Sequence, residues 1–229
     1  MLTHALHDLL QHLENAARPT GRPRPRLLAV SKTQPAEAVA ALAAAGQCAF
    51  GENYVQEALA KQQALAGLGL EWHLVGHLQS NKAREAATRF DWVQTVDRAK
   101  LVAALARHRP HGMASLNVLI QVNIDDEASK HGCQPGEVDA LSGLVAAQPG
   151  LALRGLMAIP APHPGAGTRR SAFRRMKSLF DALAAIHPEV DTLSMGMSDD
   201  LDLAIAEGAT MVRIGTALFG ARPRTKETP

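Results

Sequence analysis

The sequence predicts an α/β protein built as a (β/α)8 barrel, also called a TIM barrel. Short apolar segments alternate with amphipathic ones eight times along the 229 residues. The connections are short, which is typical of parallel βαβ units, and eight such units can close a barrel of this length. An open doubly wound sheet is the alternative. It is disfavoured because the first strand–helix turn, residues 31–35, has no G-x-G-x-x-G sequence.

An extra helix and a linker precede the first strand. Residues 1–17 place leucines at helical spacing and lack the basic region and cleavage site of a signal peptide. Residues 18–26 form a linker rich in proline and arginine. A chain of this length can bury a large core as one unit, so we expect residues 1–229 to form a single domain.

The expected strands are short apolar runs, and the expected helices carry apolar residues at intervals of three or four. In chain order, the strands lie at 26–31, 48–51, 72–76, 92–96, 116–123, 151–159, 192–196 and 211–215. The helices behind them lie at 35–46, 53–65, 80–88, 98–108, 135–148, 169–186 and 199–208, with a short turn at 216–220. Pro35 starts and Gly46 ends the first of these helices, and Ser80 is expected to cap the third. The run LNVLIQVN at 116–123 has the strongest strand pattern.

Composition narrows the classes of function. Hydrophobic residues make up 46% and charged residues 20%, as in ordinary globular proteins, and no apolar run reaches the length of a membrane span. A net charge of +2 with 3% aromatic residues disfavours a nucleic-acid surface. Cys48 and Cys133 are far apart and have no CxxC partner, which fits a reducing cytoplasm. We expect a monomer, because no exposed apolar stripe is evident.

Lys32 is the residue most indicative of chemistry. Barrels of this type carry their functional residues at the C-terminal ends of the strands, and Lys32 is the one of seven lysines directly at such an end. Partial desolvation lowers the pKa of an ammonium group, and the free amine then attacks carbonyl groups. The alternative is a charged residue that marks where the strand meets solvent. Position alone does not separate these two interpretations.

The last two strand ends indicate a phosphate site. Residues 194–198 and 213–216 contain glycine and hydroxyl residues, and each segment leads into a helical turn. Helix N-termini offer backbone N–H groups to a phosphate, and barrels commonly bind phosphate after strands seven and eight. Ser198 also suits an N-cap position, and both roles use the same amides.

An amine and a phosphate site at one mouth point to pyridoxal 5′-phosphate (PLP), which carries an aldehyde and a phosphate. Arg213 shares a strand face with Gly215 and is the candidate partner of the ring nitrogen. An arginine does not give up its proton, so the ring would stay neutral and accept electrons poorly, which disfavours carbanion chemistry.

A metal site is not predicted. His73 and His77 lie four residues apart, but on a strand and its exit rather than on a helix, and no third ligand is evident. The remaining candidates for chemistry are weaker. His4, His7 and His12 are expected to be solvated, and the two tryptophans are expected in the core.

Longer motifs carry a family resemblance. They are AVSKTQP (29–35), FGENYVQEALAK (50–61), WHLVGHLQSNKAR (72–84), VLIQVNIDDEASKHG (118–132), LRGLMAIP (153–160), LSMGMSDDLDLAI (193–205) and TMVRIGTALFG (210–220). In this order they resemble the pyridoxal phosphate homeostasis protein family over almost the whole chain after the linker. The resemblance implies a barrel similar to the N-terminal domain of alanine racemase (PLP fold type III), without that enzyme's second domain.

The resemblance also implies the roles of individual residues. Lys32 would hold PLP as an internal aldimine, and Arg213 would face the ring nitrogen. Lys130 matches a family lysine associated with passing the cofactor on. The phosphate would be held by Ser198, Gly215 and Thr216. The residues near the cofactor would also include Asn53, Ser194 and Met195.

The function implied is intracellular PLP (vitamin B6) homeostasis, by binding PLP and delivering it to apo-enzymes, without an established reaction. Two alternatives stay open, a PLP-dependent amino-acid racemase and a Schiff-base aldolase that needs no cofactor. A racemase of this type is expected to use a base on each face of the cofactor. Tyr54, the only tyrosine, lies at the start of an expected helix and is not an obvious second base.

Overall fold

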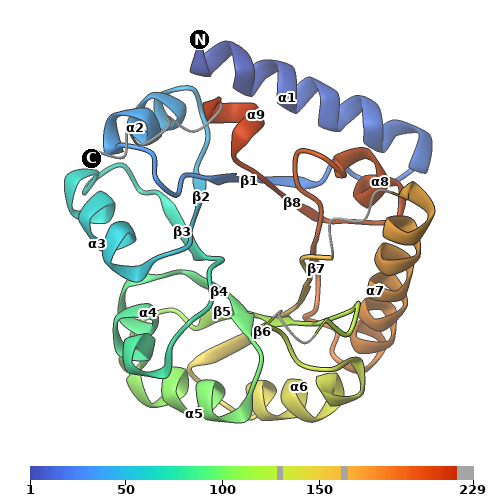
Figure 1. Cartoon of the computed structure of the whole chain (residues 1–229). Helices are drawn as coiled ribbons and strands as arrows, with labels where there is room; N and C mark the ends of the chain where they lie inside the picture. Colours follow the sequence, from blue (N-terminus) through green and yellow to red (C-terminus); the bar gives the residue numbers. More distant parts are fainter. Residues whose placement is uncertain (128–130, 161–164, 221–229) are drawn as a thin grey trace, which may run out of the picture.

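The protein is a closed barrel of parallel strands, seen in a computed structural model that describes residues 1–127, 131–160 and 165–220 (Figure 1). The strands follow each other around the barrel in chain order, and β1 pairs with β8 to close it. They are β1 (Arg26–Val30), β2 (Ala49–Glu52), β3 (Glu71–Leu74), β4 (Trp92–Val96), β5 (Leu116–Gln121), β6 (Leu151–Met157), β7 (Thr192–Ser194) and β8 (Met211–Ile214). The predicted barrel is confirmed, and the open-sheet alternative is wrong.

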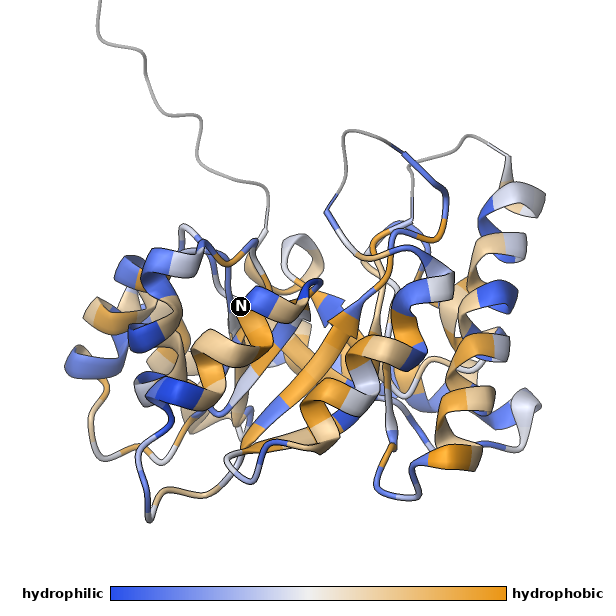
Figure 2. Ribbon diagram, turned by 90° about the horizontal axis from the view of Figure 1, so that it is seen from below, coloured by the Kyte–Doolittle hydropathy of each residue, from blue (hydrophilic) through white to orange (hydrophobic). Residues whose placement is uncertain are grey.

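The helices form a ring outside the strands (Figure 1). They are α1 (Leu2–Ala17), α2 (Ala36–Ala44), α3 (Val55–Ala64), α4 (Ala83–Arg89), α5 (Ala99–His108), α6 (Val138–Ala146), α7 (Ala166–Ile186), α8 (Leu201–Ala206) and α9 (Thr216–Phe219). Among the described residues, three 3-10 turns accompany them: η1 (Arg18–Thr20), η2 (Ser80–Lys82) and η3 (Pro135–Glu137). Hydrophobic residues concentrate on the strands and on the helix faces that cover them, as Figure 2 shows. The core therefore lies between the strands and the helix ring.

The expected extra helix is α1, and it covers one side of the barrel. Leu6, Leu9 and Leu13 are buried, and the helix packs against α2, α8 and α9. Its histidines are exposed, as predicted, and His12 Nε2 lies 2.7 Å from Asp202 Oδ1 on α8. The helix thus contributes core surface at the seam between β8 and β1.

Two details of the helix starts differ from expectation. Ser80 lies inside η2, and that turn has no side-chain cap, so Ser80 does not cap α4. The N-cap of α8 is Asp200 rather than Ser198. In both places an extra turn separates the strand from its helix, which moves the helix start along the chain.

Both tryptophans are buried, as predicted, and Cys48 and Cys133 are free thiols. Within the part of the chain that the structure describes, no helix has both the length and the apolar surface needed to cross a bilayer.

Candidate functional site

A cavity of about 560 Å³ opens among the turns that follow the C-terminal ends of the strands. Most of its lining comes from the turns after β1, β7 and β8. These turns are distant in sequence and meet because β8 pairs with β1. Six residues predicted to bind the cofactor line this cavity, namely Lys32, Asn53, Ser198, Arg213, Gly215 and Thr216.

Lys32 is half-buried and is presented by a constrained turn just beyond β1. The next residue, Thr33, has a φ of 62°, in the left-handed region that a β-branched residue rarely adopts. Its N–H donates to Glu57 Oε1 at 2.5 Å, and the Ser31 N–H donates to Gly51 O at 2.9 Å. Bonds on both sides of Lys32 therefore hold the backbone that carries it.

A buried lysine lies behind this turn. Lys61 on α3 is only 5% exposed, and its Nζ donates to Ser31 O at 2.6 Å and to Glu52 Oε1 and Glu57 Oε1 at 2.7 Å each. Burial raises the pKa of Glu52, and hydrogen bonds from Lys61 and Ser31 partly offset this effect. We call Ser31, Glu52, Glu57 and Lys61 the lysine-turn network. This network was not predicted from the sequence, although Glu57 and Lys61 lie four residues apart on an expected helix, which is the spacing of a helical ion pair.

Arg213 on β8 places a fixed positive charge in the cavity wall. Its side chain is almost fully buried, with Nη1 donating to Ser194 Oγ and Nη2 to Ala158 O, each at 2.8 Å. Burial lowers the pKa of Arg213 to about 10, so the guanidinium stays protonated at neutral pH. These two bonds fix the orientation of the guanidinium group in the cavity wall.

A chain of buried hydrogen bonds continues from Arg213 into the barrel interior. Ser194 Oγ donates to Gln94 Oε1 at 2.7 Å, Gln94 Nε2 donates to His73 Nδ1 at 2.9 Å, and His73 Nε2 donates to Glu71. Ser194 is fully buried and is not among the residues that line the cavity. Its contact with the site is therefore the bond to Arg213, and Gln94 and His73 support it from below.

Met195 is also fully buried and stands outside the cavity lining. Its sequence neighbourhood is constrained by Gly196, which has a φ of 93° and whose missing Cβ would lie 2.5 Å from the Ala204 side chain. Only glycine fits this turn without strain. Met195 thus belongs to the packing beneath the β7 turn.

The β7 and β8 turns form the predicted phosphate end. Asp200 Oδ1 accepts the Met197 N–H at 2.6 Å, which shapes the turn that exposes Ser198. Gly215 is the N-cap of α9, and a Cβ there would lie 3.1 Å from Val30 O. The first amides of a helix have no intrahelical acceptors, so Thr216 offers both a hydroxyl and a backbone donor to the cavity.

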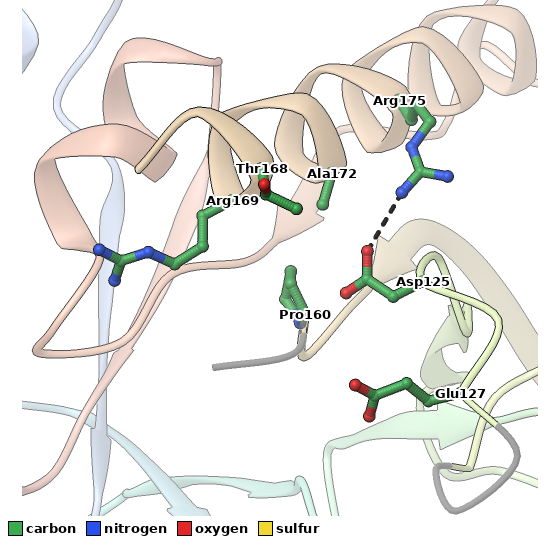
Figure 3. Close-up of a pocket in the computed structure, with 7 residues that line it drawn as sticks. All are labelled: Asp125, Glu127, Pro160, Thr168, Arg169, Ala172 and Arg175. Atoms are coloured by element: carbon green, nitrogen blue, oxygen red, sulfur yellow. Dashed lines mark hydrogen bonds and ion pairs between the residues drawn. The ribbon is translucent and has the colours of Figure 1, made fainter. Parts of the chain in front are cut away.

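Other candidates lie elsewhere. Tyr54 is 64% exposed and is not among the cavity-lining residues. Lys130 lies outside the described residues. A smaller cavity of about 300 Å³ adjoins α7 and the turn after β5, where Arg175 Nη2 pairs with Asp125 Oδ1 at 3.1 Å (Figure 3). It shares no lining residue with the cavity around Lys32.

Glu71, at the end of the series of buried hydrogen bonds that starts at Arg213, makes the stability of the protein depend on pH. Burial disfavours the charged form of Glu71, but bonds and charges from His73 and Arg26 outweigh this and lower its pKa to about 2. A carboxylate with a pKa of 4.5 when unfolded then stabilises the fold above that pH, and loses this contribution as the pH falls to 2. We expect the free energy of unfolding to fall by about 2–3 kcal/mol over this range.

Urea unfolding at a series of pH values measures this effect. Glu71→Gln should flatten the profile below pH 4.5, whereas substitution of the exposed carboxylate Glu14→Gln should not. Burial also lowers the pKa of His73, so some stability is lost already below pH 6.5, where the unfolded imidazole takes up a proton. Equal slopes for Glu71→Gln and the unsubstituted protein between pH 5 and 2 would contradict the assignment.

Comparison with known proteins places this geometry in a family. The family model described as alanine racemase, N-terminal domain, matches residues 4–223. The pyridoxal phosphate homeostasis protein of Haemophilus influenzae is 51% identical over 227 residues, covering 96% of each chain. The chain belongs to the pyridoxal phosphate homeostasis protein family.

Solved structures agree with the family membership. PipY of Synechococcus elongatus is 38% identical, and the match covers 96% of this chain and 100% of PipY. The TM-score is 0.87 for the PipY structure without PLP and 0.83 for the structure with PLP bound. Alanine racemase from Corynebacterium glutamicum shares the fold with a TM-score of 0.67 at 22% identity, and the match covers 63% of that enzyme. The predicted family and the predicted fold are both confirmed.

Proposed function

We propose that this family member binds PLP in the cavity around Lys32 and serves PLP homeostasis. The observation that carries the proposal is the convergence of Lys32, Arg213 and the Gly215–Thr216 turn on one cavity. An amine, a buried cation and helix-start amides are the groups that an aldehyde, a pyridine ring and a phosphate need. The name of the Haemophilus relative and the PLP-bound form of PipY support the same ligand.

Each residue has a defined task in this proposal. Lys32 Nζ would hold the cofactor through its aldehyde carbon, with loss of water, and the constrained turn presents this amine to the cavity. Ser198, Gly215 and Thr216 hold the phosphate, and Asn53 lines the cavity beside Lys32. When bound, PLP supplies an aldehyde that reacts reversibly with amines.

Arg213 would face the ring nitrogen and keep it unprotonated. The guanidinium is already hydrogen-bonded to Ser194 and Ala158 and keeps its own proton at neutral pH. A ring held this way is a poor electron sink, so the site is suited to holding the cofactor rather than to carbanion chemistry.

We infer a binding role without turnover of amino acids, with residues 1–229 acting as one domain. Tyr54 is exposed and outside the cavity lining, so it is poorly placed to act as a second base. A racemase function is the second candidate, favoured by the shared fold. Sustained racemisation by the purified protein that disappears in Lys32→Ala would establish it, whereas no turnover with PLP bound supports the binding role.

The binding proposal is tested by adding PLP to the purified protein and recording the visible spectrum. A band above 400 nm that becomes permanent on borohydride reduction, with the label mapped to Lys32, is the expected result. A colourless protein without label would contradict PLP binding and favour the cofactor-free aldolase. We further propose that the protein delivers PLP to apo-enzymes and that Lys130 takes part in this transfer. We also propose that the protein is a monomer located in the cytoplasm.

Gln94→Leu tests the support beneath Arg213. The substitution leaves Ser194 Oγ and His73 Nδ1 without their buried partner, so we expect a loss of about 1–3 kcal/mol in the free energy of unfolding. Because Arg213 then loses its fixed orientation, PLP affinity should fall roughly tenfold, equivalent to about 1.4 kcal/mol. Spectral titration measures the affinity, with Gln11→Leu on the exposed face of α1 as the control. Unchanged affinity would show that the buried chain does not position Arg213.

A further inference from the structure

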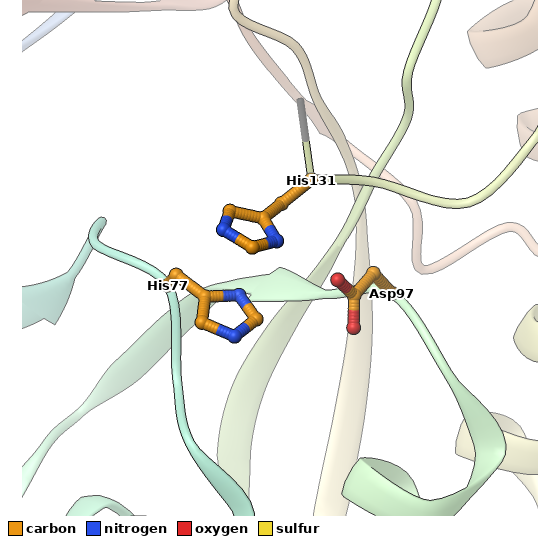
Figure 4. A group of neighbouring side chains, drawn as sticks. All are labelled: His77, Asp97 and His131. Carbon is orange, nitrogen blue, oxygen red and sulfur yellow. The ribbon is translucent and has the colours of Figure 1, made fainter. Parts of the chain in front are cut away.

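A second group of chemically active side chains lies on the other side of the barrel mouth. His77 follows β3, Asp97 follows β4 and His131 lies in the segment after β5, so three consecutive strand ends each contribute one residue (Figure 4). One ligand atom from each residue lies within 4.8 Å of the others. None of the three lines the cavity around Lys32.

The possible donor atoms of the two rings and the carboxylate lie close together. The imidazoles of His77 and His131 stack with centroids 3.6 Å apart and planes 15° apart. Figure 4 shows a nitrogen of each ring on the side nearer the Asp97 carboxylate. Zinc binds imidazole nitrogen and carboxylate oxygen at about 2.1 Å, so two ligands lie at most about 4.2 Å apart. An imidazole binds a metal through the lone pair in its ring plane, so the two stacked rings must turn out of their parallel arrangement to share one ion. Both side chains are exposed, which leaves room for this rotation.

The backbone around both histidines is already anchored. Thr95 Oγ1 donates to Gly76 O at 2.9 Å and Arg98 Nη2 donates to Leu78 O at 3.0 Å, so the residues on both sides of His77 are tied to the β4 end. Gln121 Nε2 donates to His131 O at 3.1 Å, which ties that residue to β5. Such outer contacts orient ligands and reduce the entropy lost on binding a metal.

The local charges allow a cation. Asp97 gives the group a carboxylate, which supplies the negative charge that a cation needs. Arg98 Nη1 pairs with Asp97 Oδ1 at 2.5 Å and is the opposing positive charge. That pair occupies one carboxylate oxygen, and Oδ2 remains for a metal, since a carboxylate accepts several partners.

We propose that His77, Asp97 and His131 form a binding site for a divalent transition-metal ion of the zinc class. Two imidazoles and one carboxylate suit such an ion and leave coordination positions open to water. A bound ion would join the turn after β3 to the segment after β5. The site is independent of the proposed PLP site, because it shares no residue with it.

Titration of Zn²⁺ into the protein without a histidine tag, followed by calorimetry and by competition with a chromophoric chelator, tests the site. We expect one ion per chain, and an increase in Kd of roughly tenfold or more for His77→Ala and for His131→Ala. Asp97→Asn should weaken binding in the same direction. His111→Ala, an exposed histidine at the opposite end of the barrel, and Cys48→Ser, an exposed thiol, should leave the Kd unchanged.

Two outcomes overturn the proposal. One is the absence of binding at Zn²⁺ concentrations up to roughly 100 μM, weaker than a built site would give. The other is a Kd that stays the same in both histidine variants, which would assign the ion to other groups. Far-UV circular dichroism on each variant verifies that the fold is kept, as expected for exposed side chains.

Discussion

Lys32→Ala should abolish the visible band of bound PLP and the borohydride-stable label, and weaken PLP binding by at least about 100-fold, or about 2.7 kcal/mol. The reason is that the covalent bond needs a primary amine, and among the described residues that line the cavity Lys32 is the only lysine. The half-buried side chain carries little of the core, so the variant should fold normally. Absorbance titration and peptide mapping measure both effects.

Two further variants separate chemistry from charge. Lys32→Arg keeps a positive side chain but offers no amine, so it should lose the band as completely as Lys32→Ala. Lys100→Ala removes an exposed lysine on α5 and should bind PLP like the unsubstituted protein. Label recovered on a different lysine, at full stoichiometry in Lys32→Ala, would refute the assignment.

Lys61→Met should lower the free energy of unfolding by about 3–5 kcal/mol, the cost of leaving a buried charge without its partner. Glu52 would keep only its bond from Ser31, with Oε2 already lacking a partner among the described residues. Ser31 O would lose its donor as well, and the turn that aims Lys32 would loosen. We therefore expect slower formation of the PLP band in addition to the loss of stability.

Urea unfolding and stopped-flow absorbance measure the two effects. Lys82→Met breaks a partly exposed pair with Glu85, at 3.6 Å, and should cost no more than about 0.5 kcal/mol. The double substitution Lys61→Met with Glu52→Gln removes both charges and should recover more than half of the loss. If Lys61→Met cost no more than Lys82→Met, the lysine-turn network would have no structural role.

Features that depend on local sequence patterns were predicted correctly. Alternating apolar and amphipathic segments located every strand of the barrel, because strand and helix periodicities are read within a few residues. Strand ends also mark one face of a barrel, so Lys32, Arg213 and Gly215 could be assigned to a common mouth from order alone. The errors at Ser80 and Ser198 arose from extra turns before a helix, which leave little trace in the sequence.

Contacts between segments that are far apart in the sequence could not be predicted from local sequence patterns. No role was predicted for Lys61, although α3 places it beneath the turn of β1. Ser194 near the cofactor stays a prediction, but local patterns did not indicate that its hydroxyl bonds Gln94, 100 residues away, and supports Arg213 from inside the barrel. No third ligand was evident beside His73 and His77, and Asp97 and His131 lie near His77 only because neighbouring strand ends meet.

The barrel, its extra helix and the position of Lys32 at a strand end follow from the order of residues, since each depends on the hydrophobic period or on where a strand ends. The supports of Lys32 and Arg213 and the histidine–aspartate group depend on which strands become neighbours when β8 closes against β1. Closure brings together side chains that are far apart in the chain, and their burial then sets their hydrogen bonds and charge states.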